Sequence, residues 1–271
     1  MKSKSLINKE IDDFYSKTSE ETRLQIGLGP LEFERNKNLI SRFISQKPSI
    51  VLDVGGGPGI YSEWMAKNGH SVYLVEPVLK HIRQAQKRAK KAKFECIQGE
   101  AGNLKFENNF ADIVILHGPL YHLQDEKKRN DCLKEARRVL KPGGILLGFA
   151  INYTASTIAA LIQGVIGHDE FFSMCREELT SGIHDAPKNI PGMLPHGYYY
   201  KQEDLIKEVK ECSFEFLDIF AVEGFIWLDK NYFESQANPS KRKILMELLK
   251  LTENDKNLIS FSPHMMIAAK K

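Results

Sequence analysis

Ser-Ile-Val-Leu-Asp-Val-Gly-Gly-Gly-Pro-Gly-Ile, residues 49–60, decides the fold of this 271-residue chain. A short apolar run with one acid inside it, Asp53, stops at a cluster of glycines. Such a run is typical of a strand that is buried on both faces of a parallel sheet. Glycines let the backbone turn tightly and approach a ligand closely. Residues 60–67 follow as a helix, whose first N–H groups are free to bind a polar ligand.

The spacing of the glycines narrows the choice of ligand. A dinucleotide-binding fingerprint reads G-x-G-x-x-G, but the sixth position counted from Gly55 is Ile60. Gly55, Gly57 and Gly59 instead give G-x-G-x-G, with an acid two residues before it. This pattern resembles motif I of the class I S-adenosylmethionine (AdoMet) methyltransferases. The resemblance implies AdoMet as the cofactor, and it places Asp53, Gly55, Gly56, Gly57 and Gly59 at the cofactor. For Asp53 an alternative stays open, a strand acid that caps the following helix.

A second acid has the position that this cofactor requires. The apolar run 71–75 ends at Glu76 and Pro77, and Glu76 lies 21 positions after Gly55. A carboxylate at the carboxyl end of the neighbouring strand can accept hydrogen bonds from both ribose hydroxyls. NAD-binding folds use the same device, so Glu76 alone does not separate the two cofactors.

Strands and helices alternate from Ser49 onward, which predicts a parallel sheet with right-handed crossovers and a ligand at the carboxyl ends of its strands. Leu-Lys-Pro-Gly-Gly at 140–144 matches an element that is common before the fifth strand of this superfamily. We expect a Rossmann-like, doubly wound α/β sheet, mostly parallel with an antiparallel C-terminal strand. The expected strands are 50–54, 72–75, 94–98, 113–116, 144–150, 214–220 and 264–269, and the expected helices are 60–68, 79–91, 126–140, 202–211 and 241–251.

Four parts follow from this pattern. Residues 1–48 form a charged N-terminal helical segment, 49–151 the AdoMet-binding core, and 201–271 the C-terminal part of the core. Residues 152–200 are rich in Gly, Pro, His and aromatic residues and do not alternate. Because long stretches of this kind in compact domains are usually functional, we expect 152–200 to be a lid that caps the pocket and selects the substrate.

The loop after the third strand offers contacts to adenine. In the superfamily an acid at this place contacts the adenine amino group, and a neighbouring backbone N–H contacts a ring nitrogen. The resemblance therefore implies Glu100 and Ala101 as cofactor-binding residues. An exposed loop acid is the rival interpretation of Glu100.

The loop after the fourth strand, His-Gly-Pro-Leu-Tyr-His-Leu at 117–123, faces the sulfonium centre in the superfamily. It resembles that of a bacterial small-molecule-type subgroup, which carries Gly-Pro-Leu-Tyr-His-Leu here. His117, beside the cofactor, and His122 are candidates for substrate positioning or general base catalysis, and Tyr200 of the insertion is a candidate wall of the acceptor site. For each of these three residues, ordinary packing is the alternative. We expect no metal, because the spacing of His168, His184 and His196 matches no ligand motif.

Composition limits the partners. A formal charge of +3 does not by itself favour nucleic acid, although basic helix ends such as 87–93 leave RNA open. Four scattered cysteines without a C-x-x-C pair indicate reduced thiols and a cytoplasmic protein. No apolar run approaches the ~20 residues of a membrane helix. We expect an AdoMet-dependent methyltransferase with a small-molecule acceptor; a tRNA wobble-uridine-type methyltransferase or a non-catalytic AdoMet-binding protein are the alternatives, and the oligomeric state stays open.

Overall fold

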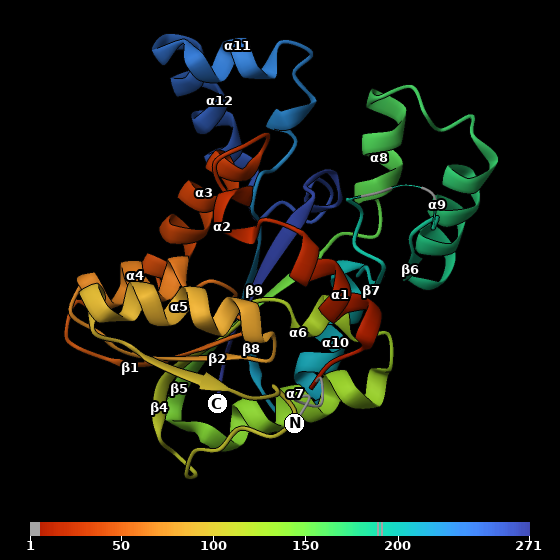
Figure 1. Ribbon diagram of the computed structural model, residues 1–271. Helices are drawn as coiled ribbons and strands as arrows, with labels where there is room; N and C mark the ends of the chain where they lie inside the picture. Colours follow the sequence, from red (N-terminus) through yellow and green to blue (C-terminus); the bar gives the residue numbers. More distant parts are fainter. Residues whose placement is uncertain (1–5, 189, 191) are drawn as a thin grey trace.

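A seven-stranded sheet forms the centre of the molecule (Figure 1). The structure is a computed structural model that describes residues 6–188, 190 and 192–271. The strand order is β3-β2-β1-β4-β5-β9-β8, and β9 runs antiparallel to both of its neighbours. The expected fold class is therefore confirmed. The strands are β1 (Ile50–Val54), β2 (Ser71–Glu76), β3 (Glu95–Gln98), β4 (Ala111–Leu116), β5 (Leu140–Ile151), β8 (Glu215–Ala221) and β9 (His264–Lys270).

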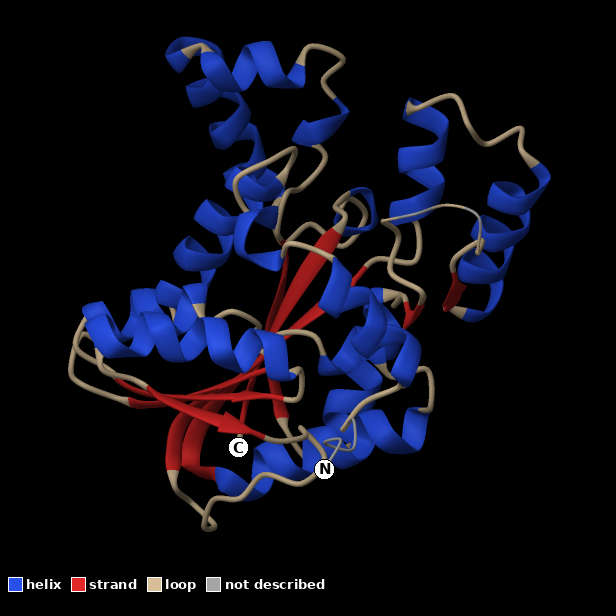
Figure 2. Ribbon diagram, viewed as in Figure 1, coloured by secondary structure: helices blue, strands red, loops and turns tan. Residues whose placement is uncertain are grey.

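Helices cover both faces of the sheet (Figure 2). Alternate residues of β1 explain this arrangement, because Val51 packs with the buried side chains of one face and Leu52 with those of the other. The first face carries α3 (Gly29–Ser41), α4 (Ile60–Lys67) and α5 (Leu79–Ala92), and the second carries α7 (Glu126–Val139) and α10 (Gln202–Glu211).

Strand β5 begins earlier than the sequence suggests. We expected a strand from Gly144, but pairing starts at Leu140, which lies opposite Ala111 of β4. The register then shifts before Ile113 pairs with Ile145. A bulge thus absorbs the Pro-Gly-Gly sequence inside the strand, since bulges accommodate residues that interrupt a regular ladder.

Residues 152–200 are more regular than expected. They form α8 (Ala155–Ile162), α9 (Asp169–Ser181) and a hairpin of β6 (Ile183–Asp185) and β7 (His196–Tyr198). The two helices share a small apolar core of their own and stand apart from the sheet in Figure 1.

The ends of the chain complete the fold. The N-terminal segment contributes α1 (Lys9–Lys17) and α2 (Glu20–Arg23) before α3, and the short helix α6 (Pro119–His122) follows β4. The region between β8 and β9 holds η1 (Ile226–Leu228), α11 (Tyr232–Ala237), α12 (Pro239–Thr252) and η2 (Ile259–Phe261). All four cysteines are free thiols. Of the described helices, none has the length and apolar character that crossing a membrane requires.

Candidate active site

One large cavity lies at the carboxyl ends of β1, β2 and β4. Its volume is about 940 Å³, near the upper end of the range for small-molecule sites. The described residues that line it come from the glycine loop, from the ends of β2, β4 and β5, and from the N-terminal segment. Of the predicted residues, the lining includes Gly55, Gly56, Gly57, Glu76, Pro77, Glu100, Ala101, His117 and His122.

The glycine loop is shaped to let a ligand approach the backbone. Gly55 has a φ of +77°, and a Cβ there would lie 2.2 Å from the carbonyl oxygen of His117. Its N–H donates to the carbonyl of Val75 at 2.7 Å, which ties the loop to β2. A side chain at this position would therefore disrupt the loop, and glycine is required.

Glu76 is fixed at the end of β2. One carboxylate oxygen accepts the N–H of Gly57 at 3.0 Å, and the other accepts the N–H of Val78 at 2.9 Å. The residue is only 4% exposed and borders the cavity. Its carboxylate is thus held rigidly beside the glycine loop, where a bound ribose can be reached by the remaining lone pairs.

Two predicted cofactor residues, Asp53 and Gly59, are not among the described residues that line the cavity. Asp53 is fully buried and accepts a 2.6 Å hydrogen bond from the hydroxyl of Ser62 in α4. Gly59 precedes α4, and a Cβ there would lie 3.1 Å from Ala85 in α5. Both residues pack behind the loop, and no hydrogen bond from Asp53 to a backbone N–H of α4 is found within the described residues. Their contact with the cofactor stays a prediction.

His117 is oriented by Asp53. Its Nδ1 lies 3.0 Å from the buried carboxylate, and its ring is stacked between Tyr61 and Phe149, with centroids 4.7 and 4.4 Å away. Because a carboxylate only accepts hydrogen bonds, Nδ1 is the nitrogen that donates to Asp53. Nε2 is buried and has no partner among the described residues. His117 therefore offers the cavity wall a held, unengaged proton acceptor.

His122 lines the cavity in a different environment. Its Nε2 lies 2.8 Å from the hydroxyl of Tyr15 in α1. Burial, and secondly the neighbouring His81, lower the pKa of His122 to about 3. The imidazole is consequently neutral at physiological pH, and its main contact is with the N-terminal segment.

The structure corrects the expectation for Tyr200. Its side chain is fully buried in the core, and its hydroxyl donates to Glu208 of α10 at 2.8 Å. The same carboxylate binds Arg129 of α7, with a shortest contact of 2.7 Å. Tyr200 is not among the described residues that line the cavity; it helps to pin α7 and α10 together, so packing is its role.

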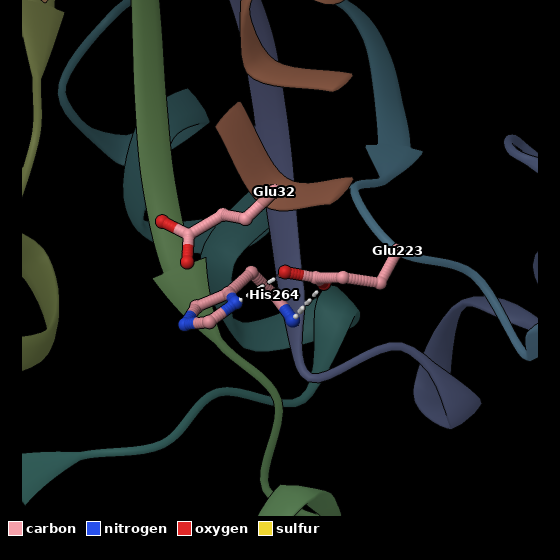
Figure 3. Close-up of side chains that lie close together, drawn as sticks. All are labelled: Glu32, Glu223 and His264. Carbon is pink, nitrogen blue, oxygen red and sulfur yellow. Dashed lines mark hydrogen bonds and ion pairs between the residues drawn. The ribbon is translucent and has the colours of Figure 1, made fainter. Parts of the chain in front are cut away.

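A charged cluster that we did not anticipate consists of Glu32 of α3, Glu223 after β8, and His264 of β9 (Figure 3). Glu32 and His264 line the cavity. Arg23 holds Glu32 through two hydrogen bonds of 2.6 and 2.9 Å. Burial opposes the charge on Glu32, but Arg23 outweighs it and lowers the pKa of Glu32 to about 2. Glu223 accepts from the hydroxyl of Ser262 and from both the backbone N–H and Nδ1 of His264.

His264 takes up a proton readily in this cluster. Burial lowers its pKa, but the carboxylate of Glu223, 2.7 Å from Nδ1, outweighs burial and raises the pKa to about 8. The candidate ligand atoms of the three residues lie within 4.8 Å of one another, as in a metal site. Each carboxylate is already paired with a cation, Arg23 or protonated His264. We therefore interpret the cluster as a charge network.

The N-terminal segment forms much of the cavity roof, which sequence reasoning missed. Residues of α1, α2 and α3 line the cavity, whereas the described lining residues of 152–200 are Gly192, Leu194 and His196. Lys80 of α5 donates to three carbonyls at the end of α1. His196 of β7 contacts both Glu10 of α1 and Asp185 of β6. No short motif marks residues 1–48.

Comparison with known proteins agrees with this geometry. Residues 52–148 match the family model described as a methyltransferase domain. The ubiquinone biosynthesis O-methyltransferase of Pasteurella multocida is 27% identical over 198 residues, which cover 67% of this chain and 74% of that protein. The tRNA (carboxymethyluridine(34)-5-O)-methyltransferase of Arabidopsis thaliana is 30% identical over 112 residues, which cover 40% of this chain and 26% of that protein.

Solved structures share the fold. A protein of Pyrococcus horikoshii superposes with a TM-score of 0.63 at 17% identity, covering 95% of this chain and 98% of that chain. A SAM-dependent methyltransferase of Methanosarcina mazei gives a TM-score of 0.60 at 19% identity, covering 86% and 96%. The matched domain, the glycine loop and the strand order lead to one conclusion. The chain is a class I AdoMet-dependent methyltransferase, with AdoMet as its cofactor.

Proposed function

We propose that the protein transfers the methyl group of AdoMet to a small-molecule acceptor bound inside the cavity. One observation carries this proposal: the same cavity is lined at one end by Glu76 and the glycine loop and at the other by Arg23, Glu32 and His264. A cofactor and a small acceptor can thus meet beside His117, which lines the cavity and follows directly on β4.

The residues at the cofactor end fit AdoMet. The loop at Gly55 has no room for a side chain, and Glu76 lines the cavity beside this loop, where it can accept hydrogen bonds from a ribose. Glu100 and Ala101 border the same cavity and are suited to adenine. AdoMet supplies, when bound, an electrophilic methyl group on a sulfonium, and the protein supplies position and electrostatics.

His117 is the proposed general base. As the acceptor's nucleophilic atom bonds to the methyl carbon, its proton passes to Nε2 of His117, and the electron pair of the broken C–S bond stays on sulfur. The protonated imidazole is stabilised by Asp53, which acts as a positioning residue because it touches His117 at Nδ1. The stacking of Tyr61 and Phe149 on the ring keeps it from rotating.

The charges around the cavity favour a small molecule over tRNA. Six described lining residues are acids, Glu20, Glu32, Glu76, Glu100, Asp125 and Asp131, whereas Arg23 and Lys128 are the lysine and arginine residues among them. Nucleic acid binding depends on neutralising phosphates with Lys and Arg. An acidic cavity that is partly roofed by α1 is therefore poorly suited to an RNA strand.

Incubation with AdoMet labelled in its methyl group, together with cell extract, tests the proposal. We expect the label in the small-molecule fraction, and label in RNA or protein instead would contradict it. His117→Gln should lower transfer by roughly 10²- to 10⁴-fold, as for loss of a general base. Calorimetry with the demethylated cofactor should give an affinity within a few-fold of the parent, and His168→Gln, which changes an exposed histidine, should leave both quantities unchanged.

A further inference from the structure

His264 repeats the arrangement of His117 at the opposite end of the cavity. In both residues Nδ1 is bonded to a fully buried carboxylate, Asp53 for His117 and Glu223 for His264. Both histidines border the cavity. Figure 3 shows the second ring nitrogen of His264 pointing away from Glu223, and this Nε2 makes no hydrogen bond within the described part of the chain. Each histidine is thus oriented from behind and has a free nitrogen.

The sheet sets the separation of the two histidines. His117 follows Leu116 at the end of β4, and His264 begins β9 opposite Ile151 at the end of β5. Since β5 lies between β4 and β9, the two residues are about two strand spacings, roughly 10 Å, apart across the sheet. Phe149 of β5 stacks on His117 and points to the same face as Ile151, two residues later. A small molecule can therefore lie over β5 with a histidine at each side.

The neighbours of the two histidines differ, and those of His264 favour its protonated form. His264 faces Glu223 of the β8–η1 connection, Glu32 of α3 and Arg23 of α2. The two carboxylates raise the pKa of His264 more than Arg23 lowers it. It therefore carries its second proton at neutral pH and presents Nε2–H as a donor. His117, beside Asp53, Tyr61 and Glu32, is the group that we propose to accept the proton of the nucleophile.

We propose that His264 binds the methyl acceptor directly, donating a hydrogen bond from Nε2 to a second polar atom of the acceptor, while Glu223 positions its ring. The inference rests on the proposed function and adds a substrate class: a small molecule that carries an oxygen or nitrogen with a free lone pair besides its nucleophilic group. Protonated His264 stabilises the negative charge that builds up on the acceptor when His117 removes the acceptor's proton. The two histidines are thus assigned opposite tasks in one step.

The pH profile of methyl transfer tests this assignment. The probe is the small-molecule fraction of extract that takes up label, diluted until the rate is proportional to kcat/KM. Because His264 must keep its proton, the parent rate should fall as the pH rises through about 8. His264→Gln retains an N–H donor but does not titrate, so it should keep the rate within about 10-fold and lose this alkaline decline. His264→Ala should lower the rate about 10- to 100-fold, as for loss of a charged hydrogen bond.

The variant Glu223→Gln tests whether Glu223 positions and charges the ring of His264 or only supports the fold. Removing the carboxylate that favours the proton should move the alkaline decline to lower pH. Binding of the demethylated cofactor by each variant, measured by calorimetry, shows that the variant is folded, and His168→Gln is the matched control. An alkaline decline that persists in His264→Gln, or a parent-like rate in His264→Ala, would overturn the assignment. If the parent labels no small molecule at any pH, the proposed function itself fails, and this inference fails with it.

Discussion

Four histidines of the described chain are bonded to buried carboxylates: His81 to Glu76, His117 to Asp53, His184 to Glu178 and His264 to Glu223. They differ in what their second ring nitrogen, Nε2, contacts. In His184, Nδ1 contacts Glu178 and Nε2 lies 2.7 Å from the carbonyl of Leu194, so both nitrogens are engaged within the fold. His117 and His264 are held by a carboxylate in the same way, but their Nε2 has no hydrogen-bond partner among the described residues. A buried carboxylate alone therefore does not mark a catalytic histidine, and His184, whose two nitrogens are both engaged, has a structural role.

At the same scale, Glu76 permits a sharp test of the cofactor end. Glu76→Gln keeps the size of the side chain but removes the charge that accepts ribose hydroxyls. Loss of charge-assisted hydrogen bonds typically costs about 1.5–3 kcal/mol, so the affinity for AdoMet should fall about 10- to 150-fold. Titration calorimetry checks this, with Glu95→Gln on the neighbouring strand as an exposed control. Equal affinity in the two variants would place the ribose elsewhere.

Helix α1 covers the cavity, which is the position that we had expected for residues 152–200. The ammonium group of Lys80 binds the carbonyls of Tyr15, Ser16 and Thr18, the last at 2.6 Å. A cation at a helix C-terminus satisfies carbonyls that have no partner within the helix. Tyr15 then contacts His81 and His122, both of which line the cavity. A few contacts thus hold α1 over the cavity.

Lys80→Met should loosen α1 without disturbing the sheet. We expect chymotrypsin to cleave near Phe14 and Tyr15 several-fold faster than in the parent, because locally unfolded segments are cleaved first. The bound cofactor product should also dissociate faster. Lys87→Met on the exposed side of the same helix, α5, is the control. Identical cleavage rates in parent and Lys80→Met would show that this contact does not hold the roof.

Some features of the fold and the site could be predicted from local sequence patterns, and others could not. The βα alternation and the glycine loop predicted the sheet, the place of Glu76 and the cavity edge, because each rests on local pattern. Asp53 and Gly59 are not among the described residues that line the cavity, because the sequence identifies a loop but not which of its atoms face outward. The roof, Tyr200 and His264 depend on contacts between segments far apart in the chain, such as Glu10 with His196, 186 residues away. No local pattern contains that information.

For the whole molecule, these buried pairs make stability depend on pH. The folded state raises the pKa of His264 to about 8 from an ordinary value of 6.5. The folded protein therefore binds this proton more tightly than the unfolded chain does. Its contribution is complete below about pH 6.5 and is lost as the pH rises through 8. His196, whose pKa its partners Asp185 and Glu10 raise against the effect of burial, acts in the same direction.

We expect the free energy of unfolding, from urea titrations, to fall between pH 6 and pH 9. A pKa shift is worth about 1.4 kcal/mol per unit, so losing the proton of His264 should lower the free energy of unfolding by roughly 1–2 kcal/mol. We expect the lower value, because the side chain is 30% exposed at the cavity and solvent weakens the interaction. In the His264→Gln variant the side chain does not titrate in this range, so the free energy of unfolding should fall by roughly 1–2 kcal/mol less than in the parent. His168→Gln, an exposed control, should follow the parent. Parallel curves for the parent and His264→Gln would mean that Glu223 does not hold a proton on His264, and the donor that our acceptor-binding proposal requires would then be absent at neutral pH.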